Sequence, residues 1–598
     1  MSDEVHFPDE ALARIDTLVA AIDRAEAAGI EYTDSVSIHF LRNFTVEPLE
    51  PYLKFHVLRE AIKPEISFGG YDTVLQELLD EESALRGESP DIVVVALDLS
   101  MLDQEYGRPG WCADRAIDRL REMFEAVREH TSSLIVANTM ISPVLSQEGI
   151  TTPGDAVTQE VARINAWVCE YASSDPGRFV VADWERLLLE AGQDNALDQR
   201  FWRASLAPFK AVFLDLYARE IAKVIRALKG KAKKCLVLDC DDTLWGGVIG
   251  EDGLDGIRLG TDEWPGEAYC AFQHGVLALQ ERGVLIVICS KNNEEDVWEV
   301  MRDHPNCVLK QSHLAAWRIN WEDKASNIKA LSDELNLALD SFVFVDDSPR
   351  ECQLVREFLP QVTVLQVPDD LHDYPDLILK DGLFDTLSIS DEDRHRAVLY
   401  REEIDRSKDR AVHVDLHDYL ASLQQVLRIW EAGDEDRARV TQLTQKTNQF
   451  NLTTKRYSEG QIEELMKSDQ AAVFAMSVSD RYGDLGTTGV LIARHSEGAG
   501  QIDSLLLSCR ILGRKLEIAF VDKCLQYLEE RWGISSWRAS YKPTKKNAQV
   551  ADFWDRVGFS AESGTDSIKT YRMAAGQRTD AYRDVMSIEE AGIDAGSN

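Results

Sequence analysis

Residues 235–243 read Cys-Leu-Val-Leu-Asp-Cys-Asp-Asp-Thr, and this stretch decides the fold of the central region. Its four leading apolar residues predict a buried strand, and Asp239 and Asp241 follow at the carboxyl end. In open α/β sheets, ligands bind beyond the carboxyl ends of the strands. Two carboxylates at that place can share a Mg²⁺ ion, while Asp239 attacks phosphorus and Asp241 protonates the leaving oxygen. Taken alone, the motif fits an Asp-rich turn without function equally well.

Two later apolar runs also end in polar residues. The run from Val284 to Cys289 is followed by Ser290, which could hold a phosphoryl oxygen, and the run from Phe342 to Val345 is followed by Asp346 and Asp347. The two aspartates could complete the metal site. Between these runs, Lys324 could balance the anionic charge, although a lone lysine is usually a solvated surface residue. Three such endings together favour a catalytic site.

The order and spacing of these residues resemble the four motifs of the haloacid dehalogenase superfamily. Within this superfamily, three stretches look like the signature of the FkbH-like family: residues 238–253, 288–293 and 316–321. The resemblance to that family covers nearly the whole chain. Members of that family with an assigned role load a glyceryl unit from 1,3-bisphosphoglycerate onto an acyl carrier protein for polyketide-type pathways. Two departures are Asp242, where the family usually has Asn, and Ser348, where Asn often follows the two aspartates.

The resemblance implies a Mg²⁺-dependent phosphatase and acyltransferase. Its partners would be a phosphorylated small-molecule donor and the phosphopantetheine arm of the carrier protein. Three other functions stay open: a plain phosphatase acting on another phosphorylated metabolite, an enzyme that loads a different acyl unit, and a non-enzymatic scaffold that docks carrier proteins. The predicted catalytic residues are Asp239, Cys240, Asp241, Thr243, Ser290 and Lys324, and the predicted metal ligands are Asp239, Asp241, Asp346 and Asp347.

Cys240 lies between the two aspartates, where we expect its side chain at the mouth of the site. A thiolate is a strong nucleophile and a natural acceptor for an acyl phosphate, so Cys240 is the predicted covalent acyl carrier. The alternative is a position that tolerates any small apolar residue. The cysteines at 235, 270, 289, 307 and 352 are predicted to be core residues. About forty residues separate Thr243 from Val284, which leaves room for a flap and one helix over 267–282 but not for a large cap domain.

The first region, residues 1–228, alternates apolar runs such as 36–40, 92–97 and 134–137 with helical stretches such as 113–129, which predicts a parallel α/β sheet. It resembles the SGNH hydrolase-type domain of the same family. Such hydrolases need a serine after the first strand and a late Asp-x-x-His. Residues 40–44 hold no serine, and Asp198 is followed by Phe201 in place of histidine. We therefore expect a scaffold or docking domain without esterase activity.

The third region, residues 427–575, has an α+β pattern and resembles the GNAT acyltransferase fold that binds coenzyme A. Residues 508–515 match the start of its phosphate-binding loop, so Arg510 and Gly513 are predicted to contact a pantetheine arm. Lys515 replaces a small residue of that loop and puts coenzyme A binding in doubt. The basic cluster Lys542, Lys545 and Lys546 is either a solvated loop or a dock for an acidic carrier protein.

The bulk composition excludes several classes. A net charge of −39 over 598 residues makes nucleic acid an improbable partner. The longest apolar runs are too short to span a bilayer, and the acidic start lacks a signal-peptide pattern, so we expect a cytoplasmic protein with reduced thiols. The expected order is the α/β domain (1–228), the catalytic domain (229–387), a helical linker (388–426), the α+β domain (427–575) and a frayed polar tail (576–598).

Overall fold

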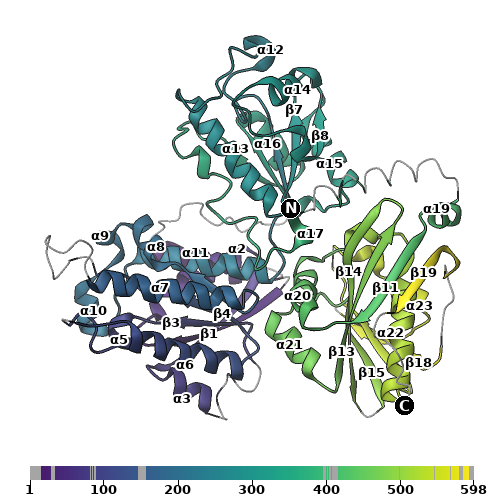
Figure 1. The fold of residues 1–598 in the computed structure, drawn as a ribbon, viewed down its shortest axis with the longest axis horizontal. Coiled ribbons are helices and arrows are strands. Elements are labelled where there is room, and N and C mark those ends of the chain that lie inside the picture. The colour runs from purple at the N-terminus through teal and green to yellow at the C-terminus, as the bar shows by residue number, and fades with distance from the viewer. Residues whose placement is uncertain are drawn as a thin grey trace. The chain divides into compact units, whose positions relative to one another are not determined.

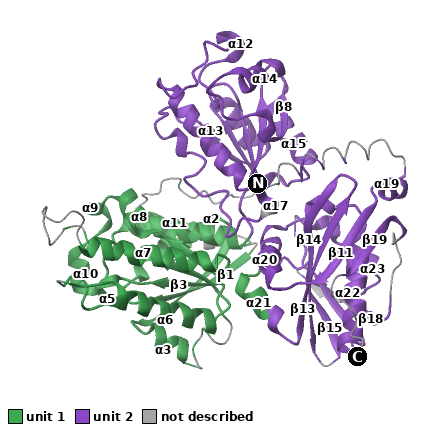
Figure 2. Ribbon diagram, in the orientation of Figure 1, with its two compact units in different colours: residues 1–229, 457–464 green, residues 230–456, 465–598 purple. Residues whose placement is uncertain are grey.

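The structure is a computed structural model. It describes residues 15–577 and 583–590, except for 28–31, 33, 81–82, 84, 86–88, 109, 144, 146–155, 395–398, 401, 403–405, 407–414, 497, 545 and 566–567. The chain forms two compact units (Figure 2). Unit 1 comprises residues 1–229 and 457–464, and unit 2 comprises residues 230–456 and 465–598.

Unit 1 is an α/β domain around a five-stranded sheet of order β2-β1-β3-β4-β5, in which all neighbouring strands are parallel (Figure 1). Parallel strands need crossover connections, and helices supply them here. Its strands are β1 (Asp34–Arg42), β2 (Ile62–Tyr71), β3 (Ile92–Ala96), β4 (Leu134–Asn138) and β5 (Phe179–Ala182). Its helices are α1 (Ile15–Ala27), α2 (Glu50–Arg59), α3 (Val74–Leu79), α5 (Leu99–Leu102), α6 (Asp114–His130), α7 (Ala156–Ser174), α8 (Trp184–Ala191), α9 (Gln193–Ala196), α10 (Gln199–Ser205) and α11 (Ala211–Leu228). The predicted parallel sheet is confirmed.

The first part of unit 2 is a second parallel sheet, of order β10-β9-β6-β7-β8. Its strands are β6 (Cys235–Leu238), β7 (Leu285–Ser290), β8 (Leu314–Ile319), β9 (Phe342–Asp346) and β10 (Thr363–Gln366), and its helices are α12 (Ile249–Asp252), α13 (Gly266–Glu281), α14 (Glu294–Asp303), α15 (Lys324–Glu334) and α16 (Pro349–Phe358). Leu236 and Leu238 of β6 belong to one apolar core, while Cys235 and Val237 belong to another. Alternate residues of a strand face opposite sides, so helices cover this sheet on both faces.

The second part of unit 2 is built on a nine-stranded mixed sheet of order β17-β18-β16-β15-β14-β13-β11-β19, with β12 paired to β15. Its strands are β11 (Gln425–Glu431), β12 (Phe450–Asn451), β13 (Ala471–Asp480), β14 (Gly483–Ser496), β15 (Ala499–Leu507), β16 (Ser536–Tyr541), β17 (Ser560–Thr565), β18 (Ile568–Ala574) and β19 (Met586–Glu590). Its helices are α17 (Asp391–Arg394), α19 (Leu416–Ser422), α20 (Arg437–Lys446), α22 (Leu516–Trp532) and α23 (Phe553–Val557). Helix α21 (Glu459–Lys467) belongs to unit 1 up to residue 464 and to unit 2 from residue 465. The predicted α+β class is confirmed.

Two predictions for this part need correction. The tail was expected to fray, but Met586–Glu590 forms β19 and pairs in parallel with β11. The residues of β19 are mostly polar and exposed, as befits an edge strand, and this hides the strand from a search for apolar runs. The predicted helical linker contains α17 and α19, and its last residues already belong to β11. The other residues of the tail and of the linker lie partly outside the described residues.

Candidate active site

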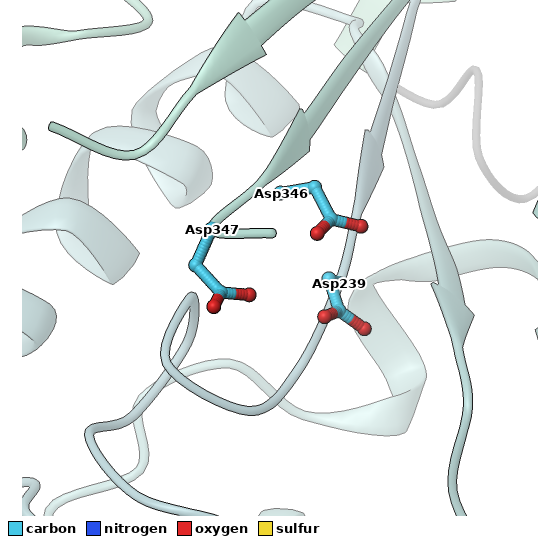
Figure 3. Close-up of side chains that lie close together, drawn as sticks. All are labelled: Asp239, Asp346 and Asp347. Carbon is cyan, nitrogen blue, oxygen red and sulfur yellow. The ribbon is translucent and has the colours of Figure 1, made fainter. Parts of the chain in front are cut away.

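Three aspartates meet at the carboxyl edge of the β10-β9-β6-β7-β8 sheet (Figure 3). Asp239 directly follows β6, Asp346 ends β9 and Asp347 follows it, and one ligand oxygen from each lies within 4.8 Å of the others. The sheet order brings them together because β6 and β9 are neighbouring parallel strands, with Leu238 paired to Val345. The predicted convergence of Asp239, Asp346 and Asp347 is therefore present in the structure.

Lys324 lies among these carboxylates. It is the first residue of α15, only 3% exposed, and its Nζ lies 2.9 Å from Asp239 Oδ2 and 2.5 Å from Asp346 Oδ2. Burial alone would lower the pKa of Lys324, but the charges of Asp239 and Asp346 outweigh it and raise this pKa above its usual value. The lysine is therefore a cation. It lies where the sequence analysis predicted it, among the carboxylates whose charge it balances.

One ammonium does not neutralise three carboxylates. Burial and the charge of Asp239 raise the pKa of Asp346 to about 7, and burial with the charges of Asp239 and Asp242 raises the pKa of Asp347 to about 6. Among the described residues, Asp239 Oδ1 is buried without a hydrogen-bond partner. A hard oxygen donor set with surplus negative charge and an unpaired oxygen fits a Mg²⁺ ion.

Asp241 departs from the predicted ligand set. Its carboxylate is outside the three-aspartate cluster, because Oδ1 accepts hydrogen bonds from Trp245 Nε1 (2.9 Å) and Ile249 N (3.1 Å), and Oδ2 accepts one from Asn292 Nδ2 (2.9 Å). These three donors orient the side chain away from a ligand role. Burial raises the pKa of Asp241, which suits the proton-donor role predicted for it.

The two predicted hydroxyl residues, Ser290 and Thr243, are both buried. Ser290 ends β7, is 2% exposed, and its Oγ accepts a hydrogen bond from Asn292 Nδ2 at 3.1 Å. Thr243 is fully buried, and its Oγ1 has no hydrogen-bond partner among the described residues. Asn292 therefore ties Ser290 to Asp241, a role that the sequence analysis missed. Its position directly beyond the predicted strand end was the available signal for it.

Asp242 adopts a left-handed backbone conformation in the turn that follows β6. Its φ of 49° lies in the left-handed region, which Asp and Asn adopt more readily than most residues, and its Oδ1 accepts a hydrogen bond from Gly247 N at 2.7 Å. The exchange between Asn and Asp at this position therefore preserves the turn. The residues between Thr243 and Val284 hold α12 and α13, in line with the small lid that we predicted.

No family model matches the chain, and no curated protein matches it. Among solved structures, it is similar to the N-terminal part of the protein BF1531 from Bacteroides fragilis, which contains a phosphatase domain and was crystallised in complex with Mg. The identity is 26% and the TM-score 0.57, over 63% of this chain and 100% of that one. Nearly two thirds of the chain thus resemble a structure that has a phosphatase domain.

Acetyltransferase structures match a smaller share of the chain. The ribosomal-protein-S18-alanine N-acetyltransferase from Escherichia coli is 12% identical over 26% of this chain and 97% of its own, with a TM-score of 0.20. A putative acetyltransferase of the GNAT family from Desulfovibrio desulfuricans is 16% identical over 25% of this chain and 98% of its own, with a TM-score of 0.21.

The location predicted for the Cys240 side chain, at the mouth of the site, is wrong. Its side chain is 0% exposed and packs with Leu236 and Leu238 in the sheet core, not at the mouth of the site. The reason is strand alternation: Cys240 continues the face of Leu236 and Leu238, while Asp239 faces the opposite way. Burial and the charge of Asp239 raise the pKa of Cys240 well above its usual value, which disfavours a thiolate. The five cysteines predicted as core residues are all buried.

The loop with Arg510 and Gly513 precedes α22 in unit 2. Backbone N–H groups of Ile511, Leu512 and Arg514 donate to carbonyl oxygens within the same loop, and Arg510 Nε donates to Ser508 Oγ at 3.3 Å. The structure therefore turns much of this loop inward. Contact of Arg510 and Gly513 with a pantetheine arm stays a prediction.

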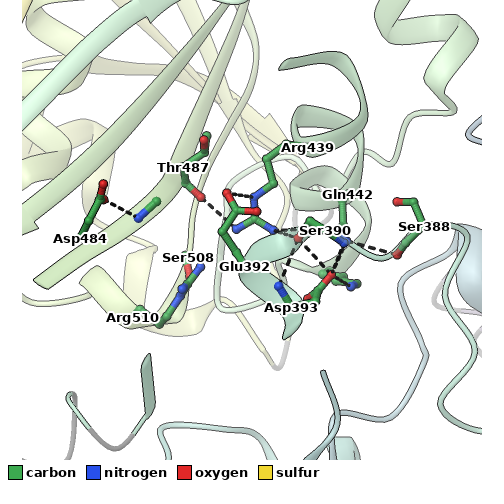
Figure 4. A network of polar contacts seen from close by, with 12 residues as sticks. Ser388, Ser390, Glu392, Asp393, Arg439, Gln442, Asp484, Thr487, Ser508 and Arg510 are labelled. Atoms are coloured by element: carbon green, nitrogen blue, oxygen red, sulfur yellow. Dashed lines mark hydrogen bonds and ion pairs between the residues drawn. The ribbon is translucent and has the colours of Figure 1, made fainter. Parts of the chain in front are cut away.

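A polar network lies near this loop within unit 2 (Figure 4). Arg439 donates to the carbonyl oxygen of Thr487 at 3.0 Å, Gln442 donates to that of Ser388 at 3.2 Å, and Lys446 lies 2.9 Å from Asp393, which is 1% exposed. Arg439, Lys446 and Arg510 also line a pocket. These contacts fix the start of the predicted linker against α20.

Of the three lysines predicted to form a docking site for a carrier protein, two lie within the described residues. Lys545 lies outside the described residues, and Lys546 forms an ion pair with Asp340. The backbone N–H of Lys542 donates to the carbonyl oxygen of Leu452 at 2.8 Å. Lys546 is therefore engaged within unit 2, and docking of a carrier protein by this cluster stays a prediction.

None of the described helices combines the length and apolar character that a bilayer crossing needs.

Proposed function

We propose that this chain is a Mg²⁺-dependent phosphatase whose nucleophile is Asp239. The observation that carries the proposal is the cluster of Asp239, Asp346 and Asp347 around Lys324, with Asp239 Oδ1 buried and unpaired. These three aspartates would hold Mg²⁺, which would neutralise charge on the phosphate when bound. The similarity to a Mg-bound structure with a phosphatase domain supports the same reading.

The residues of the chain divide the chemistry between them. An oxygen of Asp239 attacks phosphorus, and the bond from phosphorus to the leaving oxygen breaks. Asp241, held by Trp245 and Asn292, gives its proton to the leaving oxygen. Lys324 holds Asp239 in place and offers positive charge to the phosphoryl group. Water then cleaves the phosphoryl group from Asp239 and restores the carboxylate.

We further propose that the substrate is an acyl phosphate such as 1,3-bisphosphoglycerate, which also carries a phosphate ester. The thiol of an acyl carrier protein in polyketide-type biosynthesis attacks the acyl carbon, the bond from that carbon to the phosphate oxygen breaks, and phosphate leaves with the thiol proton. The aspartate site then removes the remaining phosphate ester. The resemblance of residues 238–253, 288–293 and 316–321 to the FkbH-like family supports this finer proposal. The small lid supports it also, because a macromolecular partner needs an open site. The cytoplasm remains the proposed compartment.

Metal dependence tests the coarser function. Phosphate release from acetyl phosphate and from 1,3-bisphosphoglycerate is expected to require Mg²⁺ and to stop in excess chelator, since three clustered carboxylates would otherwise repel the substrate phosphate. The measurement is colorimetric phosphate release, with and without a carrier protein. If phosphate release is the same with and without chelator, the assignment as a Mg²⁺-dependent phosphatase is contradicted. If phosphate release is the same with and without the carrier protein, the plain phosphatase is favoured.

The burial of Cys240 leads to a second prediction. We expect Cys240→Ala to load the carrier protein within about threefold of the wild-type rate, because a buried, protonated thiol is a poor nucleophile. Cys270→Ala, another buried cysteine of the same domain, is the matched control. Intact-protein mass spectrometry of the wild type with 1,3-bisphosphoglycerate is the measurement. A glyceryl adduct that hydroxylamine removes, absent in Cys240→Ala and present in the control, would restore the covalent role of Cys240.

A further inference from the structure

Unit 1 contains a serine, a histidine and a glutamate in contact. Ser67 on β2 and His39 on β1 are register partners of the parallel pair, and Ser67 Oγ lies 2.8 Å from His39 Nδ1. On the other side of the ring, His39 Nε2 lies 2.8 Å from Oε1 of Glu77, a residue of α3. The three side chains thus stand in the order nucleophile, base and carboxylate.

We propose that Ser67, His39 and Glu77 form a second catalytic site, independent of the aspartate site, that cleaves small carboxylic esters. Hydrolases of the resembling type have their serine and histidine at the places of residues 40–44 and 198–201, so this group occupies a different position. The inference does not depend on the proposed phosphatase function.

Accessibility matches the three roles. Ser67 is exposed, His39 is 5% exposed beneath it, and the side chain of Glu77 is 18% exposed. A substrate can therefore reach the hydroxyl while the base and its carboxylate stay sheltered from water. Gly69 lets Glu77 come this close, because a Cβ at position 69 would meet Glu77 Oε2 at 2.2 Å.

When the imidazole is neutral with its proton on Nε2, Nδ1 can accept the Ser67 proton, which the hydroxyl can otherwise donate to the carbonyl oxygen of Ile38 at 3.4 Å, and Nε2 faces Glu77. Burial lowers the pKa of His39, although the charge of Glu77 opposes this shift, so the ring is available as a base at neutral pH. The His39–Glu77 pair has the distance of a hydrogen bond but not its alignment in this conformation. Catalytic hydrogen bonds often tighten when substrate binds.

A hydrolase of this kind also needs hydrogen-bond donors for the oxyanion, and the edge of the sheet can supply them. Within the described part of unit 1, β2 has a strand neighbour on one side only, and the outer side of an edge strand carries backbone N–H groups that no second strand pairs. Such donors can stabilise the oxyanion of an ester intermediate. Glu65, also exposed on β2, and Glu77 make the surroundings anionic, which disfavours phosphate esters and favours neutral acyl esters.

The proposed reaction balances as follows. Ser67 Oγ bonds to the ester carbonyl carbon while its proton moves to His39 Nδ1. The bond from that carbon to the alkoxy oxygen breaks, and the alcohol leaves with the proton from His39. Water then attacks the acyl-serine with the same help, so that a carboxylic acid leaves and Ser67 regains its proton. Glu77 stays ionised throughout and orients the ring.

The test uses the full chain with p-nitrophenyl acetate and a fluorophosphonate label. We expect turnover of the ester and labelling of Ser67, with Ser67→Ala, and His39→Gln, each losing about 100-fold or more, and Glu77→Gln losing about tenfold. Gly69→Ala should resemble Glu77→Gln, because it displaces that carboxylate. The circular dichroism and thermal midpoint of each variant report whether unit 1 is folded, because the aspartate site belongs to unit 2. Asp239→Asn should leave the esterase activity intact.

Ser100 is the matched control serine, since its residue is exposed and its Oγ bonds to Asp98 Oδ1 without an imidazole. Labelling of Ser67 at least about tenfold faster than Ser100, and dependent on His39, supports the site. Labelling at equal rates, or undiminished in His39→Gln, overturns it. Ester turnover that persists in Ser67→Ala overturns it also.

Discussion

Asp239→Asn is expected to lower phosphate release by about 1000-fold or more, which is the scale on which removal of a covalent nucleophile acts. The amide keeps the shape of the side chain but cannot attack phosphorus. It also removes one of the three clustered carboxylates, so Mg²⁺ should bind more weakly. Phosphate release measured over a range of Mg²⁺ concentrations separates the two effects, because loss of the nucleophile persists at saturating metal.

Inactivation by Asp239→Asn should not reflect unfolding. The charge of Asp239 raises the pKa of both Asp346 and Asp347, so in the absence of metal these carboxylates repel one another. Removing one charge should leave the thermal midpoint of the metal-free protein unchanged or higher. Added Mg²⁺ should raise the midpoint of the wild type more than that of the variant. A lower midpoint without metal would contradict this account of the cluster.

Asp242→Asn is the matched control, three residues further along the chain. Its oxygen accepts a hydrogen bond from Gly247 N, and an asparagine can accept the same bond at the same left-handed backbone conformation. We expect phosphate release within about tenfold of the wild type. Equal loss of activity in Asp242→Asn and Asp239→Asn would mean that any change of charge at this edge inactivates the enzyme, and Asp239 would lose its assigned role.

Much of the aspartate site could be predicted because it follows from strand ends. Apolar runs marked β6, β7 and β9, and in a parallel sheet their carboxyl ends share one edge. These strand ends predicted that Asp239, Ser290 and Asp346 lie together, whereas Lys324 was predicted from its place in the order of the motifs. The spacing between motifs could not show which oxygens converge, so Asp241 was assigned to the metal, although Trp245 and Asn292 hold its carboxylate.

The error for Cys240 was avoidable in principle. Residues two apart on a strand share a face, so Leu236, Leu238 and Cys240 belong together, and Leu236 and Leu238 are core residues. The position of Cys240 between two aspartates in the sequence suggested exposure at the site, but it does not change the face on which the side chain lies. For Cys240, the alternation of side chains along the strand predicts burial correctly, whereas its closeness in sequence to two site aspartates does not.

The Ser67, His39 and Glu77 group could not have been predicted from the sequence. It depends on the register of β1 against β2, and β2 carries Pro64, Gly69 and Gly70, which are unusual within a strand. It also depends on α3, a short helix whose Glu77 approaches β2 over a glycine. No local pattern links residues 39, 67 and 77, because their contacts are set by tertiary structure alone.

Lys324→Met is expected to lower phosphate release by about 100-fold or more and to destabilise the protein as well. The substitution keeps the length of the side chain but leaves Asp346, which is 0% exposed, and Asp239 without their buried cation. Removing one partner of a buried ion pair costs about 3–5 kcal/mol of stability, because the remaining charge is left uncompensated. Thermal midpoints without added metal should therefore fall. Lys291→Met, which breaks a more exposed pair with Glu351, should change them little.

A double variant separates the two roles of this lysine. In Lys324→Met/Asp346→Asn the uncompensated carboxylate at 346 is gone, while an asparagine there can still accept the hydrogen bond from Ser348 N. We expect the double variant to melt at a higher temperature than Lys324→Met and yet to release no more phosphate. If the double variant melts below Lys324→Met, charge compensation is not what Lys324 contributes to the fold. If it regains phosphatase activity, Lys324 acts through stability alone and not on the phosphoryl group.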